Sequence, residues 1–569
     1  MIGGILQQLR LRDRQLFLSA TVIIGVLAGL SAVLFTLTIE RLSYWFFGMS
    51  PSYQRLLLAP TLVSLVTGVL LARYFRDCRG SGIPQTEMAF HLAHGKIPFR
   101  VAVGKFLTGV LCVGSGHSMG REGPSVQIGA SLASAIGRRL RLSPDRVKTL
   151  VPIGAAAALS AAFNTPVAAV IFALEEIIGD LNAGVIGPAV VASVTSVIVE
   201  RSILGNHPLF RVPQYHLVKP EELLAYAFLG VVGGVISLAF CKGLLWARSM
   251  FARLPRSTVM LQPALGGLMI GAMLLVFPQV MGVGYEYVDQ ALGGALVLKT
   301  LIVLCAAKLV ATIISYSSGN AGGIFAPSLY LGAMAGGAVG QIVHRFAPLS
   351  TGDPGAYALV GMGVLFAGII RAPMTSVFMI FELTQDYQIL VPLMVANLLS
   401  FMISRRYQPK PVYHALLEQD SIFLPGPESR SSDKAARARD IMTRDFVMVR
   451  PESTIESAWN QMKENGHAAF LVGTADSPLA TLGLRDIEEA VKAGKGSEPV
   501  TSLQSQSHWT HVYPDHPLNL ALEKLAQARG PLLVLGRDGH HLEGIITRQT
   551  VMDFLDRDSA KRSGDGTAS

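Results

Sequence analysis

Residues 105–130 read KFLTGVLCVGSGHSMGREGPSVQIGA, and residues 308–333 read KLVATIISYSSGNAGGIFAPSLYLGA. The two stretches align without a gap and share glycines, serines, a proline and a lysine. Their identical pairs are Lys105/Lys308, Ser115/Ser318, Gly116/Gly319, Gly120/Gly323, Pro124/Pro327, Ser125/Ser328, Gly129/Gly332 and Ala130/Ala333. The chain therefore contains an internal duplication.

The duplication continues into a second pair of similar segments. There Pro166 lies opposite Pro373, and Glu175 lies opposite Glu382. Repeats within apolar chains often have inverted topology, with a ligand bound between the halves. We expect the two halves to be inverted, although the alignment itself shows only the duplication.

Composition divides the chain in two. Half of the 569 residues are hydrophobic and 15% are charged, whereas a soluble protein carries about a quarter charged residues. Charge is sparse from Gln15 to Ser404 and dense from Glu418 onward. These features predict a large membrane domain followed by a soluble one. Lys and Arg collect at helix ends on the cytoplasmic side of membranes, so the net charge of +9 does not indicate nucleic acid.

Two smaller features bear on location and on metal or disulfide chemistry. Arg10, Arg12 and Arg14 precede the first apolar run and place residues 1–14 in the cytoplasm. That run is too long for a cleavable signal. The four cysteines form no CxxC pair, which argues against a disulfide framework and against a zinc site.

Several charge-free apolar runs approach the ~20 residues that a membrane-spanning helix needs. They lie at 15–39, 56–72, 149–174, 181–199, 223–241, 257–285 and 387–404. Other runs are interrupted by charge, glycine or proline. These lie at 106–120, 123–137, 309–344 and 354–381. Such interruptions are typical of discontinuous helices, whose ends build ion sites near the middle of the membrane.

Three glycine-rich segments stand at predicted helix starts. They are Gly80-Ser81-Gly82-Ile83-Pro84, Gly120-Arg121-Glu122-Gly123-Pro124 and Gly323-Ile324-Phe325-Ala326-Pro327. Glycine allows close backbone approach, and proline is tolerated in the first turn of a helix. The unpaired N–H groups of a helix start can hold an anion without a full opposite charge, so that the anion can leave again. The alternative is loop glycines without a ligand, but three such segments, two of them repeat mates, favour an anion path.

Glu122 is an ionisable residue inside an apolar stretch, which by default indicates function. At a helix start its carboxylate can occupy an anion site as a tethered mimic, and on protonation it can swing away. One residue would then act as gate and as proton carrier. A salt bridge between Glu122 and Arg121 is the alternative. A second pair of charges, Glu87 and Lys105, is predicted to form a structural ion pair.

Two adjacent acids, Glu175 and Glu176, follow an apolar run at the end of a predicted helix. The repeat mate of Glu175 is Glu382, so we expect Glu175 to cap a helix or to lie at an interface. Glu176 has Leu383 opposite it in the second half and is the candidate for an internal proton relay. A helix-end acid with no further role is the alternative for both.

Residues 116–120 read GHSMG and match the G-x-S-x-G pattern of hydrolase nucleophiles. A hydrolase would need a strand–turn–helix context, whereas the surrounding sequence is helical and apolar. Ala321 stands opposite Ser118 in the second repeat, and no HExxH motif indicates a zinc protease. We therefore expect the chain not to be an enzyme.

Residues 15–416 resemble the chloride channel/transporter (CLC) family, whose three anion-site motifs occur here in order and at the family's spacing. The resemblance implies an all-α multi-pass membrane domain of broken helices with an internal inverted repeat, in halves of about 15–205 and 220–405. It also implies a homodimer in the lipid bilayer, with one anion path in each subunit. We expect a prokaryotic inner membrane, with both termini in the cytoplasm.

The resemblance assigns roles to single residues. Ser81 would bind chloride through its hydroxyl, and the backbone N–H groups of Ile324 and Phe325 would add to it. The predicted chloride-binding set is Ser81, Gly82, Ile83, Ile324, Phe325 and Tyr413, the last of which matches the family's inner-gate tyrosine. Ser81 favours chloride, because nitrate-selective members have proline at this position.

Glu122 matches the external gating glutamate of the family, and Glu176 matches the internal proton glutamate. Channels of the family usually lack an acid at the second position, so the presence of both acids favours chloride/proton antiport. The alternative is a passive, proton- or voltage-gated chloride channel. A magnesium or other cation transporter would need acidic side chains along its path, and the glycine-rich helix starts argue against it.

The remainder of the chain is predicted to be a linker followed by two similar modules. Residues 417–435 are polar and rich in proline and serine. Beyond them, two units share the same order of strand, helix and strand and resemble a tandem pair of α/β CBS domains, at 436–494 and 500–558. Residues 559–569 are predicted to be disordered. We expect the pair to regulate transport from the cytoplasm.

CBS pairs bind adenine nucleotides in some proteins, through a Thr-x-x-Asp motif that contacts the ribose. Here Thr547 is followed by Thr550 where the aspartate is expected, and Gly483 takes the hydroxyl position before Asp486. Two interpretations stay open: an adenine nucleotide bound with the help of Thr547 and Asp486, or a dimerisation module without a ligand. Transport itself is expected to need no cofactor.

Overall fold

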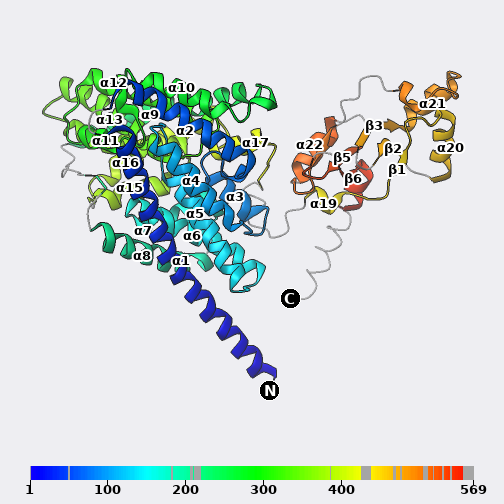
Figure 1. The fold of residues 1–569 in the computed structure, drawn as a ribbon, viewed down its shortest axis with the longest axis horizontal. Coiled ribbons are helices and arrows are strands. Elements are labelled where there is room, and N and C mark those ends of the chain that lie inside the picture. The colour runs from blue at the N-terminus through cyan, green and yellow to red at the C-terminus, as the bar shows by residue number, and fades with distance from the viewer. Residues whose placement is uncertain are drawn as a thin grey trace. The chain divides into compact units, whose positions relative to one another are not determined.

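The structure is a computed structural model, and it describes most of the chain in two compact units (Figure 1). It leaves out residues 1, 49–50, 181–182, 206–208, 211–218, 385, 425–436, 466–468, 475–476, 504–509, 517, 528–530, 539–540 and 555–569, and the side chains of 2–14, 183, 256, 447, 462–486, 503, 519, 523 and 526–527. The units are Met1–Ser421 and Ile422–Ser569, and each is considered by itself.

The first unit is built of helices. They are α1 (Ile2–Phe47), α2 (Tyr53–Arg73), α3 (Ile83–His91), α4 (Phe99–Gly114), α5 (Glu122–Arg139), α6 (Pro144–Phe163), α7 (Pro166–Phe172), α8 (Ala183–Leu204), α9 (Glu222–Ala252), α10 (Gln262–Leu274), α11 (Tyr285–Leu292), α12 (Leu298–Ser317), α13 (Phe325–Phe346), α14 (Pro354–Ile369), α15 (Pro373–Thr384), α16 (Leu390–Tyr407) and α17 (Val412–Gln419). Among the described helices, six are long and apolar enough to cross a membrane: α1, α2, α6, α8, α9 and α12. The predicted multi-pass helical domain is confirmed.

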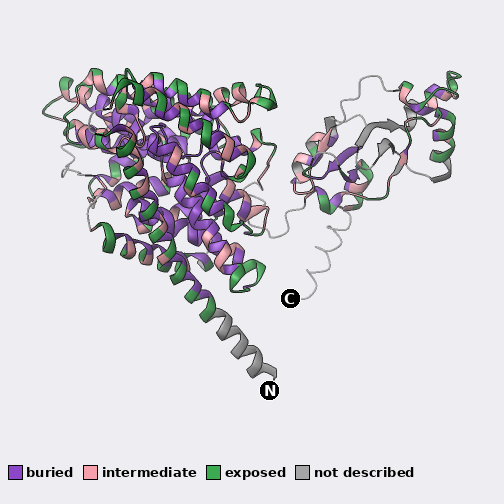
Figure 2. Cartoon of the chain, in the orientation of Figure 1, coloured by how far each residue is buried: buried purple, intermediate pink, exposed green. Residues whose placement is uncertain are grey.

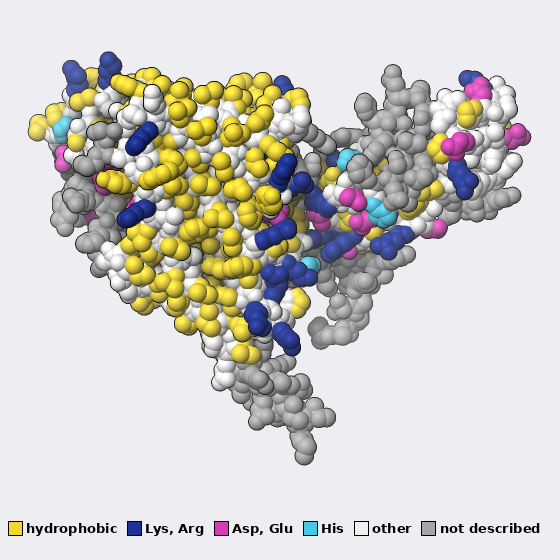
Figure 3. All heavy atoms as spheres, in the orientation of Figure 1, with side chains coloured by type: hydrophobic (Ala, Val, Ile, Leu, Met, Phe, Trp, Pro, Cys, Tyr) yellow, Lys and Arg dark blue, Asp and Glu magenta, His cyan; other side chains and the backbone are white. Residues whose placement is uncertain are grey.

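The helices of this unit bury one side and expose apolar side chains on the other. Figure 2 shows buried residues filling the interior, where α14 is buried from Gly355 to Ile369. Figure 3 shows hydrophobic side chains spread over the visible outer face. Leu34 and Val235, for example, are 58% and 56% exposed. Soluble proteins rarely expose apolar patches of this extent, so this surface faces lipid.

Two of the predicted uninterrupted runs are wrong. The run at 149–174 is divided into α6 and α7, because Asn164 adopts a left-handed conformation (φ 58°) and ends α6 before Pro166 begins α7. The run at 257–285 contains one α-helix, α10, which ends at Leu274 and is followed by a short 3-10 helix at Pro278–Val280. Both breaks add helix ends to the first unit.

The two repeats are inverted with respect to each other. Gly120 and Gly323, which are repeat mates, form an isolated antiparallel bridge. The N–H of Gly120 donates to the carbonyl of Gly323 at 2.7 Å, and the reverse bond is 2.8 Å long. Paired backbones run in opposite directions in such a bridge, so the matching turns meet antiparallel, as an inverted repeat requires. The prediction of an inverted repeat is confirmed.

The identical lysines of the two repeats form equivalent hydrogen bonds. Lys105 Nζ donates to the carbonyls of Cys78 (3.0 Å) and Gly80 (2.5 Å). Lys308 Nζ donates to the carbonyls of Val280 (3.0 Å) and Gly282 (2.7 Å). Each buried ammonium group thus fixes the chain that leads into a glycine-rich turn.

The predicted ion pair between Lys105 and Glu87 is wrong. Lys105 Nζ bonds to backbone carbonyls, and a carboxyl oxygen of Glu87 lies 2.8 Å from Nε2 of His414 instead. Glu87 therefore ties α3 to α17, the helix that ends the first unit.

The second unit contains two small sheets of the same topology. Its elements are α19 (Ala438–Ile441), β1 (Val447–Val449), α20 (Ile455–Asn465), β2 (Ala469–Thr474), β3 (Ser477–Gly483), α21 (Leu484–Lys492), β4 (His511–Val512), α22 (Leu518–Gln527), β5 (Leu532–Leu535) and β6 (Leu542–Ile546). In each sheet the first two strands pair in parallel and the last two in antiparallel. The α/β character predicted for the tail is confirmed.

Candidate functional site

The three glycine-rich segments meet, although they lie far apart in the sequence. The N–H of Gly80 donates to the carbonyl of Asn320 at 3.2 Å, and the N–H of Gly322 donates to the carbonyl of Gly80 at 3.1 Å. The bridge between Gly120 and Gly323 joins the remaining segment to this pair. The structure therefore brings together the starts of α3, α5 and α13.

Glycine is required at two positions in this cluster. Gly82 has φ 103°, a backbone conformation that favours glycine. A Cβ atom added at Gly123 would lie 2.5 Å from Oγ of Ser81. The close approach of α5 to Ser81 thus depends on the missing side chain of Gly123.

Two buried hydroxyl groups face each other beside these helix starts. Oγ of Ser81 and the hydroxyl of Tyr413 are fully buried and lie close enough to interact. Neither makes a hydrogen bond of regular geometry with a described residue. Buried polar groups are normally paired, so two such donors side by side mark a place for a small acceptor, such as an anion.

Backbone groups around Ser81 differ in their availability. The N–H of Gly82 donates to Oε1 of Gln85 at 2.9 Å, and the N–H of Ser81 lies against the hydroxyl of Tyr316. The N–H of Gly82 therefore already has a hydrogen-bond acceptor. The first N–H groups of a helix such as α3, in contrast, have no partner within the helix.

The start of α13 is fixed by aromatic packing. The ring of Phe325 lies 4.9, 5.8 and 4.4 Å from the rings of Phe163, Phe172 and Phe366, measured between centroids. Ile324 precedes the helix as its N-cap, and no side chain caps it. The unpaired N–H groups of the first turn are thus held in place for a ligand.

Glu122 lies fully buried at the first position of α5. Its Oε1 accepts a hydrogen bond from the hydroxyl of Tyr285 at 2.6 Å. The carboxyl group also lies beside the backbone N–H of Ala326, in the first turn of α13. The carboxylate thus occupies the space in front of the neighbouring helix start, as the tethered-mimic hypothesis requires.

Arg121 does not form the alternative salt bridge with Glu122. Its Nη1 lies 3.6 Å from Oε1 of Glu40, and its guanidinium carbon lies 5.8 Å from the centre of the Tyr285 ring. Glu40 is largely exposed. The Arg121 guanidinium is thus directed to the surface, and Glu122 interacts instead with the Tyr285 hydroxyl and the Ala326 N–H.

Tyr285 was not predicted from the sequence. It begins α11 directly after Gly284, whose φ of 79° marks a turn. The edge of the Phe210 ring packs against it, with ring centroids 5.0 Å apart. Only the glycine gives a sequence signal, and it indicates a helix start, not a contact with Glu122.

The two adjacent acids are directed to different places. Both lie in the π-helical turn Ala173–Ile178. Glu175 accepts hydrogen bonds from the N–H of Met374 (3.1 Å) and of Thr375 (2.8 Å), at the start of α15. The predicted capping role of Glu175 is confirmed.

Glu176 points into the protein, where 7% of its surface is exposed. It lies within electrostatic range of Tyr413 and Arg371. The extra residue of a π turn, which often marks a functional site, allows two consecutive acids to face such different surroundings. Glu176 therefore interacts electrostatically with the Tyr413 hydroxyl of the site.

The hydrolase-like segment does not form a nucleophile–base pair. Oγ of Ser118 lies 3.1 Å from Oγ1 of Thr312. The ring nitrogens of His117 lie 2.5 Å from Oγ of Ser64 and 3.3 Å from Oγ of Ser315. Activation of a serine requires a base within hydrogen-bond reach of its hydroxyl, and the histidine bonds to other hydroxyls.

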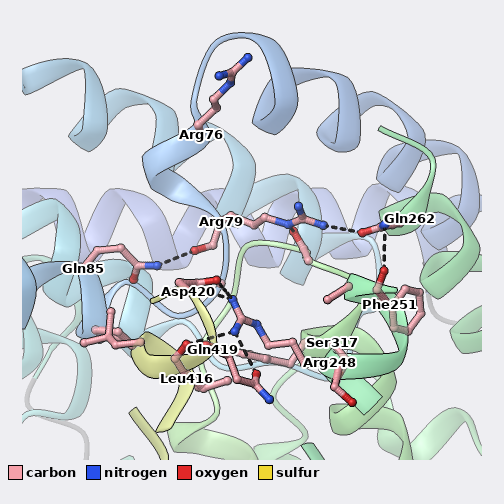
Figure 4. Close-up of a pocket in the computed structure, with 17 residues that line it drawn as sticks. Arg76, Arg79, Gln85, Arg248, Phe251, Gln262, Ser317, Leu416, Gln419 and Asp420 are labelled. Atoms are coloured by element: carbon pink, nitrogen blue, oxygen red, sulfur yellow. Dashed lines mark hydrogen bonds and ion pairs between the residues drawn. The ribbon is translucent and has the colours of Figure 1, made fainter. Parts of the chain in front are cut away.

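A cavity of about 490 Å³ opens beside Gly80 (Figure 4). It is lined by Tyr316 near the buried hydroxyl groups and by the side chains of Arg76, Arg79 and Arg248 farther out. Three arginines against the carboxylate of Asp420 give this cavity an excess of positive charge, which raises the local concentration of anions.

The predicted nucleotide residues of the tail are only partly described. Thr547 and Thr550 cap each other: the N–H of Thr547 donates to Oγ1 of Thr550 at 3.0 Å, and the reverse bond is 3.2 Å. The Thr547 hydroxyl therefore already has a backbone partner. The side chain of Asp486 lies outside the described residues.

The chain is similar in sequence and fold to several known proteins. The family model described as voltage gated chloride channel matches residues 62–405, and that described as CBS domain matches residues 438–493. A putative chloride channel protein ClcB-like from Ralstonia nicotianae is 32% identical over 72% of this chain and 98% of its own. An H(+)/Cl(-) exchange transporter ClcA from Vibrio campbellii is 31% identical over 71% and 89%. A crystal structure of a slow cyanobacterial Cl-/H+ antiporter has 28% identity and a TM-score of 0.66, covering 71% of this chain and 98% of its own.

Proposed function

This chain belongs to the voltage gated chloride channel family, and on that premise we propose that it exchanges chloride for protons across a membrane. Relatives named as H(+)/Cl(-) exchangers and the similar cyanobacterial antiporter support this reaction. The observation that carries the proposal is the buried Glu122 carboxyl group, which lies in front of the α13 helix start. There the carboxylate, beside the N–H of Ala326, and an anion compete for the start of one helix.

Chloride would bind between the hydroxyl groups of Ser81 and Tyr413, with the first N–H groups of α13 at Ile324 and Phe325 as further donors. Four donors without a lysine or arginine clamp bind an anion and still release it. The absence of regular hydrogen-bond partners for both hydroxyls among the described residues supports this assignment.

Glu122 would act as the outer gate. As a carboxylate it fills the anion site and blocks the path; once protonated it loses its attraction to the helix start and moves away, so that chloride takes its place. The displaced Glu122 then releases its proton to the outer solution, and the resulting carboxylate returns to the anion site. Alternate occupancy of one site by chloride and by the carboxylate couples the two ions.

Glu176 would pass protons between the inner solution and Glu122. Its electrostatic interaction with Tyr413 and Arg371 supports this role, because a proton carrier needs to be coupled to the polar interior of the site. A passive chloride channel, gated by protons or voltage, is the second candidate. It is favoured only if Glu176 takes no part in transport.

One chain supplies every group of this path, so each subunit of the homodimer expected for this family would carry its own. Both termini would lie in the cytoplasm of a bacterial cell, with the N-terminal arginines on the positive-inside face. The second unit would be a pair of CBS modules, about 436–494 and 500–558, that regulates transport either by binding adenine nucleotide or as a ligand-free dimerisation module. Transport would need no cofactor and no enzymatic step.

Chloride flux from liposomes, measured across a range of pH, tests the proposal at the gate. Wild-type flux should rise as the pH falls, because protonated Glu122 leaves the path. Glu122→Ala should conduct chloride at every pH without that rise. A variant that stops conducting chloride, or that keeps the pH response, would exclude Glu122 as the gate.

A further inference from the structure

Two neighbouring cavities of the first unit share the side chains of Arg76 and Arg79. One is the polar cavity of about 490 Å³ shown in Figure 4, which also includes Arg248. The other, of about 590 Å³, is lined mainly by apolar groups. These are Gly68, Leu71, Ala72, Val259, Met260 and Pro263. Together they form an amphipathic hollow that is apolar at one end and basic at the other.

The hollow lies where a membrane-spanning helix ends. Its apolar part is formed by the last turns of α2 and by the chain entering α10, and both arginines lie just beyond the end of α2. Leu65 of α2 and Leu265 of α10 are 39% and 46% exposed on the outer surface. The apolar end is thus level with lipid chains, and the basic end with lipid headgroups.

The basic end has an excess of positive charge. Within the described residues, no acidic group lies within 4 Å of the Arg76 or Arg79 guanidinium groups. Asp420, the aspartate of the polar cavity, pairs with Arg248 through both carboxylate oxygens, at 2.7 and 2.8 Å (Figure 4). One carboxylate therefore faces three arginines, and it pairs directly only with Arg248.

The Arg79 guanidinium is held in one orientation. Nε donates to the carbonyl of Gly319 at 3.3 Å, and Nη2 donates to Oε1 of Gln262 at 3.1 Å. Nη1 makes no hydrogen bond with a described residue. The fixed positive charge and the remaining N–H donors of Nη1 are suited to an oxyanion, because hydrogen bonds between a cation and an anion are strong.

We propose that this hollow binds one anionic phospholipid, with its phosphate on Arg79 and Arg76 and the upper part of an acyl chain in the apolar end. A soluble anion would use the arginines and leave the apolar end without an occupant; a neutral lipid would leave the charge uncompensated. Basic pockets between spanning helices on the cytoplasmic side suit anionic headgroups. The site shares the polar cavity beside Gly80 but includes neither Ser81 nor Glu122, and the lipid binding stands whether or not the exchange reaction is correct.

Lipid binding to the full-length protein in a neutral detergent tests this site. The probes are short-chain phosphatidylglycerol, phosphatidylcholine of the same chain length, and inorganic phosphate, each followed by native mass spectrometry and by the shift in melting temperature. The wild type should prefer phosphatidylglycerol, and Arg76→Gln should weaken that binding about fivefold, the effect expected of one arginine near an anionic headgroup. Arg79→Gln should weaken it more.

Three variants separate the parts of the site. Arg73→Gln, an exposed arginine outside both cavities, is the matched control and should bind phosphatidylglycerol as the wild type does. Ala72→Trp fills the apolar end and should weaken lipid binding while leaving phosphate binding unchanged. Arg79 also bonds to the carbonyl of Gly319, so Arg79→Gln can disturb the fold. Arg76 is exposed, so the effect of Arg76→Gln on lipid binding does not depend on folding.

Two results would overturn the proposal. The first is equal binding of the two lipids, or unchanged phosphatidylglycerol binding by Arg76→Gln and Arg79→Gln. The second is full displacement of phosphatidylglycerol by inorganic phosphate with no effect of Ala72→Trp, which would make the hollow a site for a free anion only.

Discussion

Glu175 and Glu382, repeat mates in the sequence, each cap a helix of the opposite repeat. Glu175 accepts from the N–H groups of Met374 and Thr375 at 3.1 and 2.8 Å, at the start of α15. Glu382 accepts from the N–H groups of Val167 and Ala168 at 2.9 and 2.7 Å, at the start of α7. This exchange of caps locks the two halves together, and it gives Glu175 a role that its neighbour Glu176 does not share.

Removing either cap should destabilise the protein without changing transport. Glu175→Gln and Glu382→Gln each lose an ionised acceptor for two N–H groups, which should cost about 1.5–3 kcal/mol. The loss should appear as a lower unfolding temperature of similar size in both variants. The folded fraction of each variant should transport chloride and protons in the same ratio as the wild type. A Glu175→Gln variant that is stable but uncoupled would assign the proton role to the wrong acid.

Tyr285→Phe should shift the pH dependence of chloride flux. The hydroxyl stabilises the charged form of Glu122, so its loss favours the protonated, open gate and raises the pH of half-maximal flux. A hydrogen bond to a charged group contributes about 1.5–3 kcal/mol, so the change in the flux profile should be measurable. Tyr287→Phe is the matched control and should leave the profile in place. An unchanged Tyr285→Phe profile would contradict a role for this hydrogen bond.

Ser81→Pro should change the preference between anions. Proline removes the hydroxyl that faces Tyr413 and the N–H that lies against Tyr316, so the site loses donors that suit chloride. We expect the ratio of nitrate to chloride uptake to rise several-fold over the wild type, measured by competition between the two anions in liposomes. An unchanged ratio would mean that chloride selectivity lies elsewhere in the path.

Ser118→Ala should leave transport intact. The Ser118 hydroxyl bonds to Thr312 and to none of the proposed chloride ligands, so its loss removes one neutral hydrogen bond worth about 1 kcal/mol. Chloride uptake per folded protein should match the wild type. If the variant stays folded but loses chloride uptake, the GHSMG segment has a chemical role after all.

The sequence predicted those features that depend on local chemistry. The helix starts at Ile83, Glu122 and Phe325 follow from glycine and proline at fixed spacing, and the repeat alignment identified Glu175 as a structural acid. Each helix-start signal lies within a few residues of the helix that it predicts. The role of Glu175 was recognised from its repeat mate instead, and the N–H of Met374 that it caps lies 199 positions away.

Contacts between distant residues could not be predicted in the same way. Tyr285 lies 163 positions from Glu122, and neither periodicity nor spacing links the two. For the same reason Glu87 was assigned to Lys105 instead of His414, 327 positions away. The break at Asn164 was missed because an asparagine within an apolar run gives only a weak signal for a left-handed residue.

Chloride-driven proton movement in liposomes, with the purified wild type beside Glu122→Ala and Glu176→Ala, tests the central claim most directly. An outward chloride gradient should drive protons inward against their own gradient in the wild type. Both variants should still carry chloride and move no protons. If wild-type chloride flux moves no protons, the protein is a passive channel and Glu176 is only a buried acid at the end of a helix.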